Sequence, residues 1–379
     1  MMDVIDWTTA QRVGERIAGS PPSGDVRAAL VEPRAHDFAR RVSEYSGLET
    51  PASLPPVELV DRAAWIAANL RTMRPMMAPL TERLGQSAGL LAGPLRSASG
   101  LLLGAQIGAL TGALSQRVLG QYDLALLDRA IEPRLLLLAP NLSIAARTLA
   151  VDSDELVLWV AIHEITHAVQ FTAVPWLRDH LGAMIKDLLA SVQLSLGGSS
   201  PSDDGDEQGK GKTSAGAGTS GKRAADGAFK RAPRLPDPQE LLDLVARIRR
   251  GETLRWTLGE DRWEKIERIQ AAMSVIEGHA EHTMDAIGEE ELPSLPRLRA
   301  AMTRRRTQRP LYWRIIERLL GLELKLRQYE VGRRFCDEVV ARAGAAGLAQ
   351  VWKGPDSLPT LAELERPELW LERTPTAAA

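Results

Sequence analysis

Apolar residues recur at helical spacing along most of the chain, so the pattern predicts a mainly helical protein. The segment 134–142, RLLLLAPNL, is short and apolar between a charged residue and a proline, which makes it a candidate buried strand. Other strand candidates are scarce, so the expected fold class is mainly α with at most a small β-sheet. Helices are expected over residues 3–18, 33–48, 59–73, 97–116, 152–171, 175–192, 237–250, 260–287 and 312–343.

Residues 97–116, SASGLLLGAQIGALTGALSQ, are uncharged and close to the length that spans a membrane. Glycines at every fourth position from Gly100 to Gly112 form a ladder that would let another helix approach closely. Ser, Thr and Gln recur in the segment, and no second span or aromatic belt accompanies it. We therefore expect a buried core helix and no stable membrane span.

The composition of the chain changes abruptly at residues 197–235. Most of this stretch has no Val, Ile, Leu or aromatic residue, and such a composition cannot bury enough surface to offset the entropy of ordering. We expect a disordered insert there. The other boundaries that we expect enclose a helical N-terminal domain over 1–130, a second domain over 131–355 that the insert interrupts, and a Pro-rich tail over 356–379 that frays.

Overall composition narrows the class of protein. With 379 residues, 44% hydrophobic and 25% charged, the chain is typical of soluble globular proteins. A net charge of −2 argues against a nucleic-acid partner, and the single Cys excludes an intramolecular disulfide framework or a Cys-rich zinc site. The first residues include acids and no apolar core of a signal peptide, so we expect a cytoplasmic protein.

The strongest chemical signal is HEITH at residues 163–167, within the predicted helix 152–171. Residues four apart share a helix face, so His163 and His167 can bind one Zn²⁺ while Glu164 projects toward a water on the metal. Zinc lowers the pKa of that water, and the Glu164 carboxylate can take its proton. The preceding apolar run buries the helix, where polar side chains need partners. A pair of hydrogen-bonded core histidines is the alternative interpretation.

A catalytic zinc usually has three protein ligands and one open position. The third ligand is expected from AAMSVIEGHAEHTMD, residues 271–285, where Glu277 lies on the apolar side of the helix. Glu281 lies one turn further and is expected to orient a ligand histidine. His279 is an alternative, although it points about 200° away from Glu277. Tyr329 could stabilise a developing oxyanion, with plain packing as its alternative role.

The segments HEITHAVQF, EGHAEHTMD and VLGQYDLAL resemble an actinobacterial family of zincin-like metallopeptidases, whose members are often labelled hydrolases. The opening VIDWTTAQRVGERIA is similar to a branch of that family associated with coenzyme F420 biosynthesis. The resemblance covers most of the chain outside the insert, and it implies a helical N-terminal domain followed by a zincin-like catalytic domain. It also implies zinc ligation by His163, His167 and Glu277, with Glu164 as general base. The family pattern has Asp four residues after the ligand Glu, and Glu281 replaces it here.

These observations predict a zinc-dependent metallohydrolase, in particular a peptidase that acts on an unidentified peptide or protein. A non-catalytic, zinc-stabilised protein that binds a protein partner is the alternative, and the glycine ladder and the insert would suit it. An accessory role in coenzyme F420 metabolism is a third hypothesis, which rests on the resemblance alone.

Overall fold

The computed structural model describes residues 4–22, 24, 26–87, 93–197, 259–307 and 322–374. Contacts divide the chain into two units, one formed by Met1–Leu189 with Lys265–Ala379 and the other by Ala190–Glu264. The second unit is described only at its ends, where Arg262 Nε donates to Ser191 O at 3.2 Å. The expected insert after residue 197 and the helix expected over 237–250 lie outside the described residues. The expected domain boundaries at 130 and 355 stay predictions.

A small sheet lies in the first unit. Its strands are β1 (Val57–Val60), β2 (Gly120–Asp123) and β3 (Arg134–Leu138), in the order β1-β3-β2. β1 runs parallel to β3, whereas β2 runs antiparallel to it. The central strand β3 is apolar and buried after its first residue, because both of its faces are covered. Arg134 at its start pairs with Glu58 of β1.

The pattern-based prediction for this region was right for β3 and wrong for β1. β3 occupies the first part of the candidate strand 134–142, and the chain then enters helix α5, Ala139–Leu149, with a proline in the first turn where its missing N–H costs nothing. The apolar residues from position 59 predicted a helix, but residues 57–60 form β1 and helix α3 begins only at Arg62.

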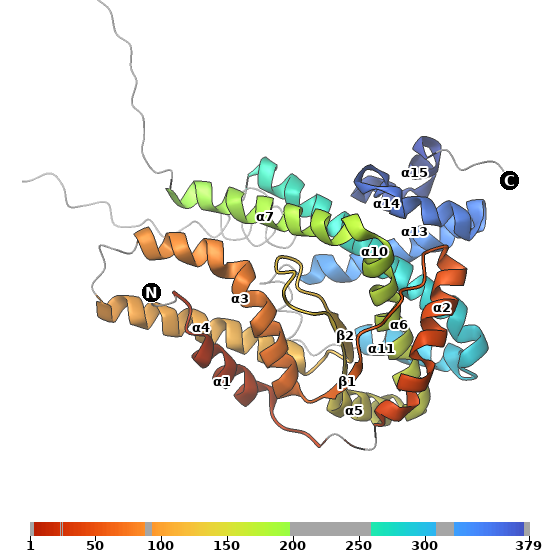
Figure 1. Ribbon diagram of the computed structural model, residues 1–379, viewed down its shortest axis with the longest axis horizontal. Helices are drawn as coiled ribbons and strands as arrows, with labels where there is room; N and C mark the ends of the chain where they lie inside the picture. Colours follow the sequence, from red (N-terminus) through yellow and green to blue (C-terminus); the bar gives the residue numbers. More distant parts are fainter. Residues whose placement is uncertain are drawn as a thin grey trace, which may run out of the picture. The chain divides into compact units, whose positions relative to one another are not determined.

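Helices cover both faces of the sheet, as Figure 1 shows. Because side chains alternate along a strand, Leu135 and Leu137 pack into one core cluster and Leu136 and Leu138 into another. The first cluster includes residues of α2 (Ala35–Ser46), α5 and α6 (Ser153–Ala173). The second includes residues of α1 (Trp7–Ala18), α3 (Arg62–Ser87) and α4 (Gly93–Ser115).

A further core cluster joins the beginning of α7 to helices that follow it in the chain. From α7 onward, the described α-helices are α7 (Pro175–Gly197), α10 (Glu260–Glu291), α11 (Leu295–Thr307), α13 (Leu322–Leu348), α14 (Leu361–Glu365) and α15 (Pro367–Arg373). Trp370 of α15 is fully buried against Phe335 of α13. The expectation that the Pro-rich tail frays is therefore wrong for its described part, which ends at residue 374.

The glycine ladder lets α4 approach the backbone of α1. A Cβ added at Gly104, Gly108 or Gly112 would lie 2.2–2.4 Å from a backbone oxygen of Asp6, Ala10 or Gly14. Larger residues at these positions would separate the two helices, so the ladder serves helix packing as its spacing predicted.

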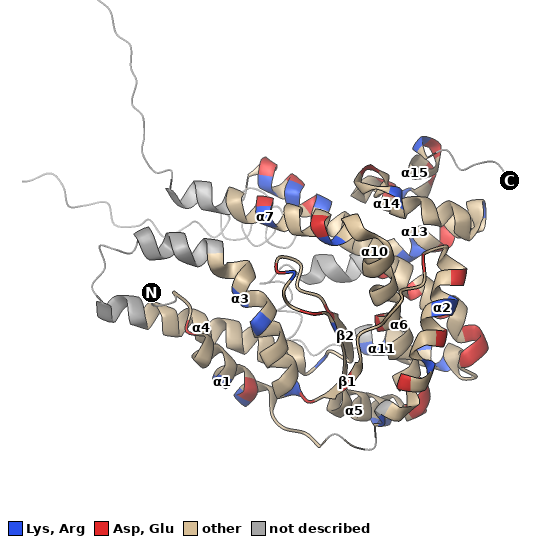
Figure 2. Ribbon diagram, in the orientation of Figure 1, with Lys and Arg blue, Asp and Glu red and all other residues tan. Residues whose placement is uncertain are grey.

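The other side of α4 is not buried, so the prediction of a buried core helix is wrong for it. Leu101 and Leu102 are 48% and 61% exposed, and no charged residue interrupts the helix from Ala98 to Ser115 (Figure 2). Within the described residues, two helical segments are long and apolar enough to cross a membrane, Ala98–Ser115 with 33% of it buried and Ser153–Ala173 with 78% buried. The second segment is α6, a core helix of the first unit.

Candidate metal centre

HEITH lies in the middle of α6, a helix whose position is tightly constrained. Asp152 caps its first turn by accepting a hydrogen bond from Glu155 N at 2.9 Å. Ile162, just before the motif, and Ile165, within it, are buried almost completely. Because apolar side chains on several faces of α6 are buried in this way, the helix cannot rotate freely, and its two histidines are held facing α10.

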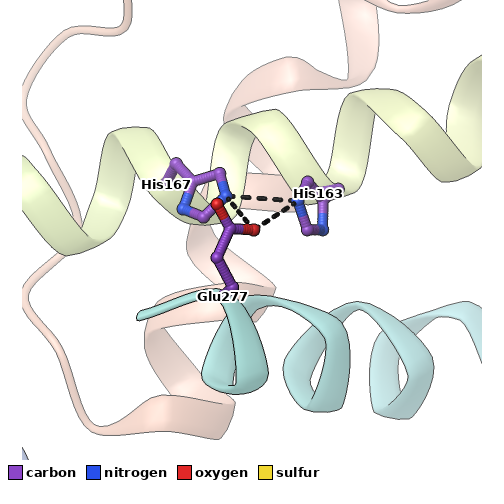
Figure 3. Close-up of side chains that lie close together, drawn as sticks. All are labelled: His163, His167 and Glu277. Carbon is purple, nitrogen blue, oxygen red and sulfur yellow. Dashed lines mark hydrogen bonds and ion pairs between the residues drawn. The ribbon is translucent and has the colours of Figure 1, made fainter. Parts of the chain in front are cut away.

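The structure brings His163, His167 and Glu277 together, as Figure 3 shows. His163 Nε2 lies 3.1 Å from His167 Nε2, and Glu277 Oε2 lies 3.5 and 3.4 Å from these two nitrogens. Taken together, the three ligand atoms lie within 4.8 Å of one another, close enough to hold a metal ion. The side chains keep 21%, 11% and 17% of their surface exposed, so the group is partly open to solvent.

The charges of this group are strongly coupled. Burial lowers the pKa of His167, but the Glu277 carboxylate outweighs burial and raises it to about 9. Burial likewise raises the pKa of Glu277, but the two imidazoles outweigh that effect and hold it well below its usual range. Glu277 is therefore an anion at neutral pH, and His167 must give up a proton before its Nε2 can bind a metal.

Glu164 faces strand β2 rather than solvent. Tyr122 N–H donates to Glu164 Oε2 at 2.7 Å. Leu138 N–H donates to Leu119 O, so the alternation of an antiparallel ladder directs the Tyr122 N–H away from β3. Burial raises the pKa of Glu164, and the nearby histidines oppose this only in part. The segment GQYD thus holds this carboxylate, a role that sequence reasoning missed because only the tertiary structure places β2 beside α6.

Gly120 lets β2 pass directly over Glu164. A Cβ added at Gly120 would lie 2.6 Å from Val160 Cγ1 and 2.9 Å from Glu164 Oε1. We expect Gly120→Ala to lower the free energy of unfolding by about 1–3 kcal/mol, because β2 or α6 must move to admit the methyl group. Urea denaturation would measure this change. Gly354→Ala is the matched control, since a Cβ there meets nothing within 4 Å, and equal effects of the two substitutions would contradict the contact.

Gln170 connects the motif helix to α10. Its Oε1 lies 2.9 Å from His167 Nδ1, and its Nε2 donates to Ile276 O at 3.0 Å and lies 2.9 Å from His279 Nδ1. His279 is buried edge-on to Trp352, and burial lowers its pKa to about 3. His279 is therefore not one of the three grouped ligands, and it contacts Gln170 instead.

The remaining predicted residues lie elsewhere. Glu281 lines a cavity of about 30 Å³ together with Trp159, Asp285, Arg299 and Arg333. Gln170, not Glu281, contacts Nδ1 of His167, so an orienting role for Glu281 stays a prediction. The side chain of Tyr329 lies outside the described residues.

Comparisons with known proteins identify the family of this chain and a protein of similar fold. A HExxH helix packed against a small sheet, with a glutamate supplied by a second helix, defines a zincin-like protein. A family model described as zincin-like metallopeptidase matches residues 5–371, so the chain belongs to that family. A comparison with curated proteins found no match.

The comparison with solved structures found a similar crystal structure, titled "a putative hydrolase with a novel fold", from Chloroflexus aurantiacus. Its TM-score is 0.63 at 27% sequence identity, over 97% of this chain and 98% of that one. This similarity extends along nearly the whole of both chains, and the family match likewise spans nearly the whole of this one.

Proposed function

We propose that this protein is a zinc-dependent peptidase whose metal ligands are His163, His167 and Glu277. The spacing of the three donor atoms carries the proposal. Ligand atoms about 2.0–2.1 Å from a tetrahedral zinc lie roughly 3.3 Å from one another, and here the three separations are 3.1, 3.4 and 3.5 Å. Two imidazole nitrogens and a carboxylate oxygen are also a donor set of catalytic zinc sites, in which a fourth position stays open.

Glu164 has the position and the environment of a general base. Zinc bound at such a site supplies Lewis acidity, which lowers the pKa of water and polarises a carbonyl oxygen. The Tyr122 N–H fixes Glu164 through Oε2, and the carboxylate can accept a proton from water and then donate it to the leaving amine. Its raised pKa suits both transfers, since a general base works best when its pKa lies closer to the operating pH.

The edge strand supports a peptide as the substrate. β2 lies at the edge of the sheet, and beside Glu164 it directs backbone groups away from β3. An extended peptide can add to such an edge through main-chain hydrogen bonds. This placement would bring a peptide carbonyl toward the three ligands and Glu164.

Glu164→Gln tests the proposal directly. We expect it to lower hydrolysis of a fluorogenic peptide library by about 10²–10⁴-fold, because the amide cannot accept the proton. Zinc content, measured by atomic emission, should stay at that of the unmodified protein. Glu338→Gln, which removes the partner of Arg342 on α13, is the matched control and should change neither quantity. Zinc binding without any hydrolysis by the unmodified protein would favour the non-catalytic alternative.

The narrower expectations from the sequence stay predictions. They are the coenzyme F420-associated branch of the family, a cytoplasmic location, the lack of a nucleic-acid partner and a possible protein partner. None of them is needed for the zinc chemistry proposed above.

A further inference from the structure

Gln170 is the polar side chain that joins the two helices of the metal centre. It lies three residues after His167 on α6 and is 0% exposed. Burying an amide costs free energy unless its atoms are hydrogen-bonded, and here both ends of the amide have partners. One partner is the ligand His167, and the other is the backbone of Ile276, which directly precedes the ligand Glu277. These partners distinguish Gln170 from a glutamine that merely fills the core.

The partners determine which way the amide points. The backbone oxygen of Ile276 can only accept a hydrogen bond, so the group that faces it at 3.0 Å must be the NH₂. The second hydrogen of this NH₂ is directed at His279 Nδ1, 2.9 Å away. Gln170 Oε1 is then the atom that faces His167 Nδ1 at 2.9 Å, and a carbonyl oxygen can only accept.

This orientation determines the tautomer of His167. Because Oε1 accepts, Nδ1 of His167 must carry the hydrogen, and the neutral ring then has its lone pair on Nε2. Nε2 is the atom that lies 3.4 Å from Glu277 Oε2 and 3.1 Å from His163 Nε2. Gln170 therefore presents the correct nitrogen to the metal.

The same side chain also sets the separation of the ligand helices. Ile276 directly precedes Glu277 on α10, so the bond from Gln170 Nε2 to Ile276 O ties α6 to the backbone next to the third ligand. A single amide thus fixes the ring of His167 and the approach of Glu277.

We propose that Gln170 is the positioning residue of the metal centre, orienting His167 through Nδ1 and holding Glu277 through the carbonyl of Ile276. This inference rests on the proposed function, because it assumes that the three ligands bind zinc. It assigns to Gln170 the orienting role that the sequence pattern led us to expect of Glu281.

The zinc dissociation constant of three variants of the full chain tests this role. It would be measured by competition with a chromogenic chelator, and unfolding in urea would be followed on the zinc-free proteins. Gln170→Met keeps the length of the side chain and removes the amide, so the zinc affinity should fall by about 10–100-fold. Gln170→Glu keeps an acceptor for His167 Nδ1 but loses the NH₂ that donates to Ile276 O, so we expect its zinc affinity to lie between those of the unmodified protein and Gln170→Met.

Thr166→Val is the matched control. Thr166 is also 0% exposed on α6, but its hydroxyl donates to Ile162 O within the same helix. Losing this buried bond should lower the free energy of unfolding and leave zinc affinity unchanged. Gln170→Met should therefore bind zinc more weakly than Thr166→Val, even if the two substitutions lower the free energy of unfolding by similar amounts.

The outcomes distinguish this inference from the function on which it rests. If the unmodified protein binds no zinc, both fall. If it binds zinc and Gln170→Met binds it equally well, the positioning role is overturned and the proposed function stands. If Gln170→Met does not fold, Gln170→Glu decides, because a zinc affinity equal to that of the unmodified protein would overturn the hold on Glu277 through the carbonyl of Ile276.

Discussion

Glu277→Gln is expected to weaken zinc binding by about 10³-fold, within a range of about 10²–10⁴. Structural zinc sites bind with about 10–16 kcal/mol, so one of three protein ligands accounts for roughly 3–5 kcal/mol. The amide also lacks the negative charge that the partly buried carboxylate of Glu277 brings to the two imidazoles. Chelator competition at neutral pH would measure the change. Glu289→Gln, an exposed position on the same helix, is the control and should leave affinity unchanged.

The pH dependence of binding gives the same substitution a second readout. Glu277 raises the pKa of His167 to about 9, so a proton competes with zinc up to that pH and affinity should rise by about tenfold per unit between pH 7 and 8. Without the carboxylate, burial lowers the pKa of His167 and only Glu164 and Gln170 still raise it, so this pKa should fall. The affinity of Glu277→Gln should therefore rise less steeply with pH over the same interval. Parallel pH profiles would show that Glu277 does not face His167 in solution.

Gly332→Ala is expected to destabilise the fold by about 3 kcal/mol or more. α10 and α13 touch backbone to backbone, since a Cβ added at Gly332 would lie 1.9 Å from Ser274 O and one added at Gly278 would lie 2.2 Å from Gly332 C. Backbone atoms cannot rotate away as a side chain can, so the helices must separate, which places the cost at or above the usual 1–3 kcal/mol of overpacking. In a helix with no such neighbour, replacing glycine by alanine would instead stabilise the protein by about 1 kcal/mol.

Urea denaturation of zinc-free protein would measure this loss, so that ligand binding does not contribute. Gly288→Ala is the matched control on α10, because a Cβ there would meet only the ends of two flexible side chains, Leu295 at 3.3 Å and Leu292 at 3.5 Å. We expect that control to stay within about 1 kcal/mol of the unmodified protein. A Gly332→Ala variant as stable as the control would mean that α10 and α13 do not make this contact.

The parts of the fold that the sequence predicted are those whose signal is local. α6 and α10 repeat their apolar residues at helical spacing, and this spacing also put His163 and His167 on one face of α6. Glu277 could be singled out because a carboxylate on the apolar side of a helix is unusual. These inferences needed no knowledge of what packs against either helix.

The sheet could not be predicted in the same way. β1 and β2 are four residues each, too short for a periodic pattern. β1 is a strand because Val57–Val60 pairs with Leu135–Leu138, almost eighty residues later, and this pairing outweighs the helical pattern that begins at Leu59. The exposed side of α4 is a similar case, since an apolar composition does not tell how much of a helix its neighbours will cover.

The sequence by itself determined the helical class of this protein, the two histidines and the glutamate beside them, and a candidate third ligand, because helix periodicity relates these residues over a few positions. Only the tertiary structure decided that Glu277 reaches both imidazoles, that Gln170 faces Nδ1 of His167, and that the N–H of Tyr122 holds Glu164. These contacts join segments that are distant in the chain or depend on the rotamer of a buried side chain, and both are set by packing.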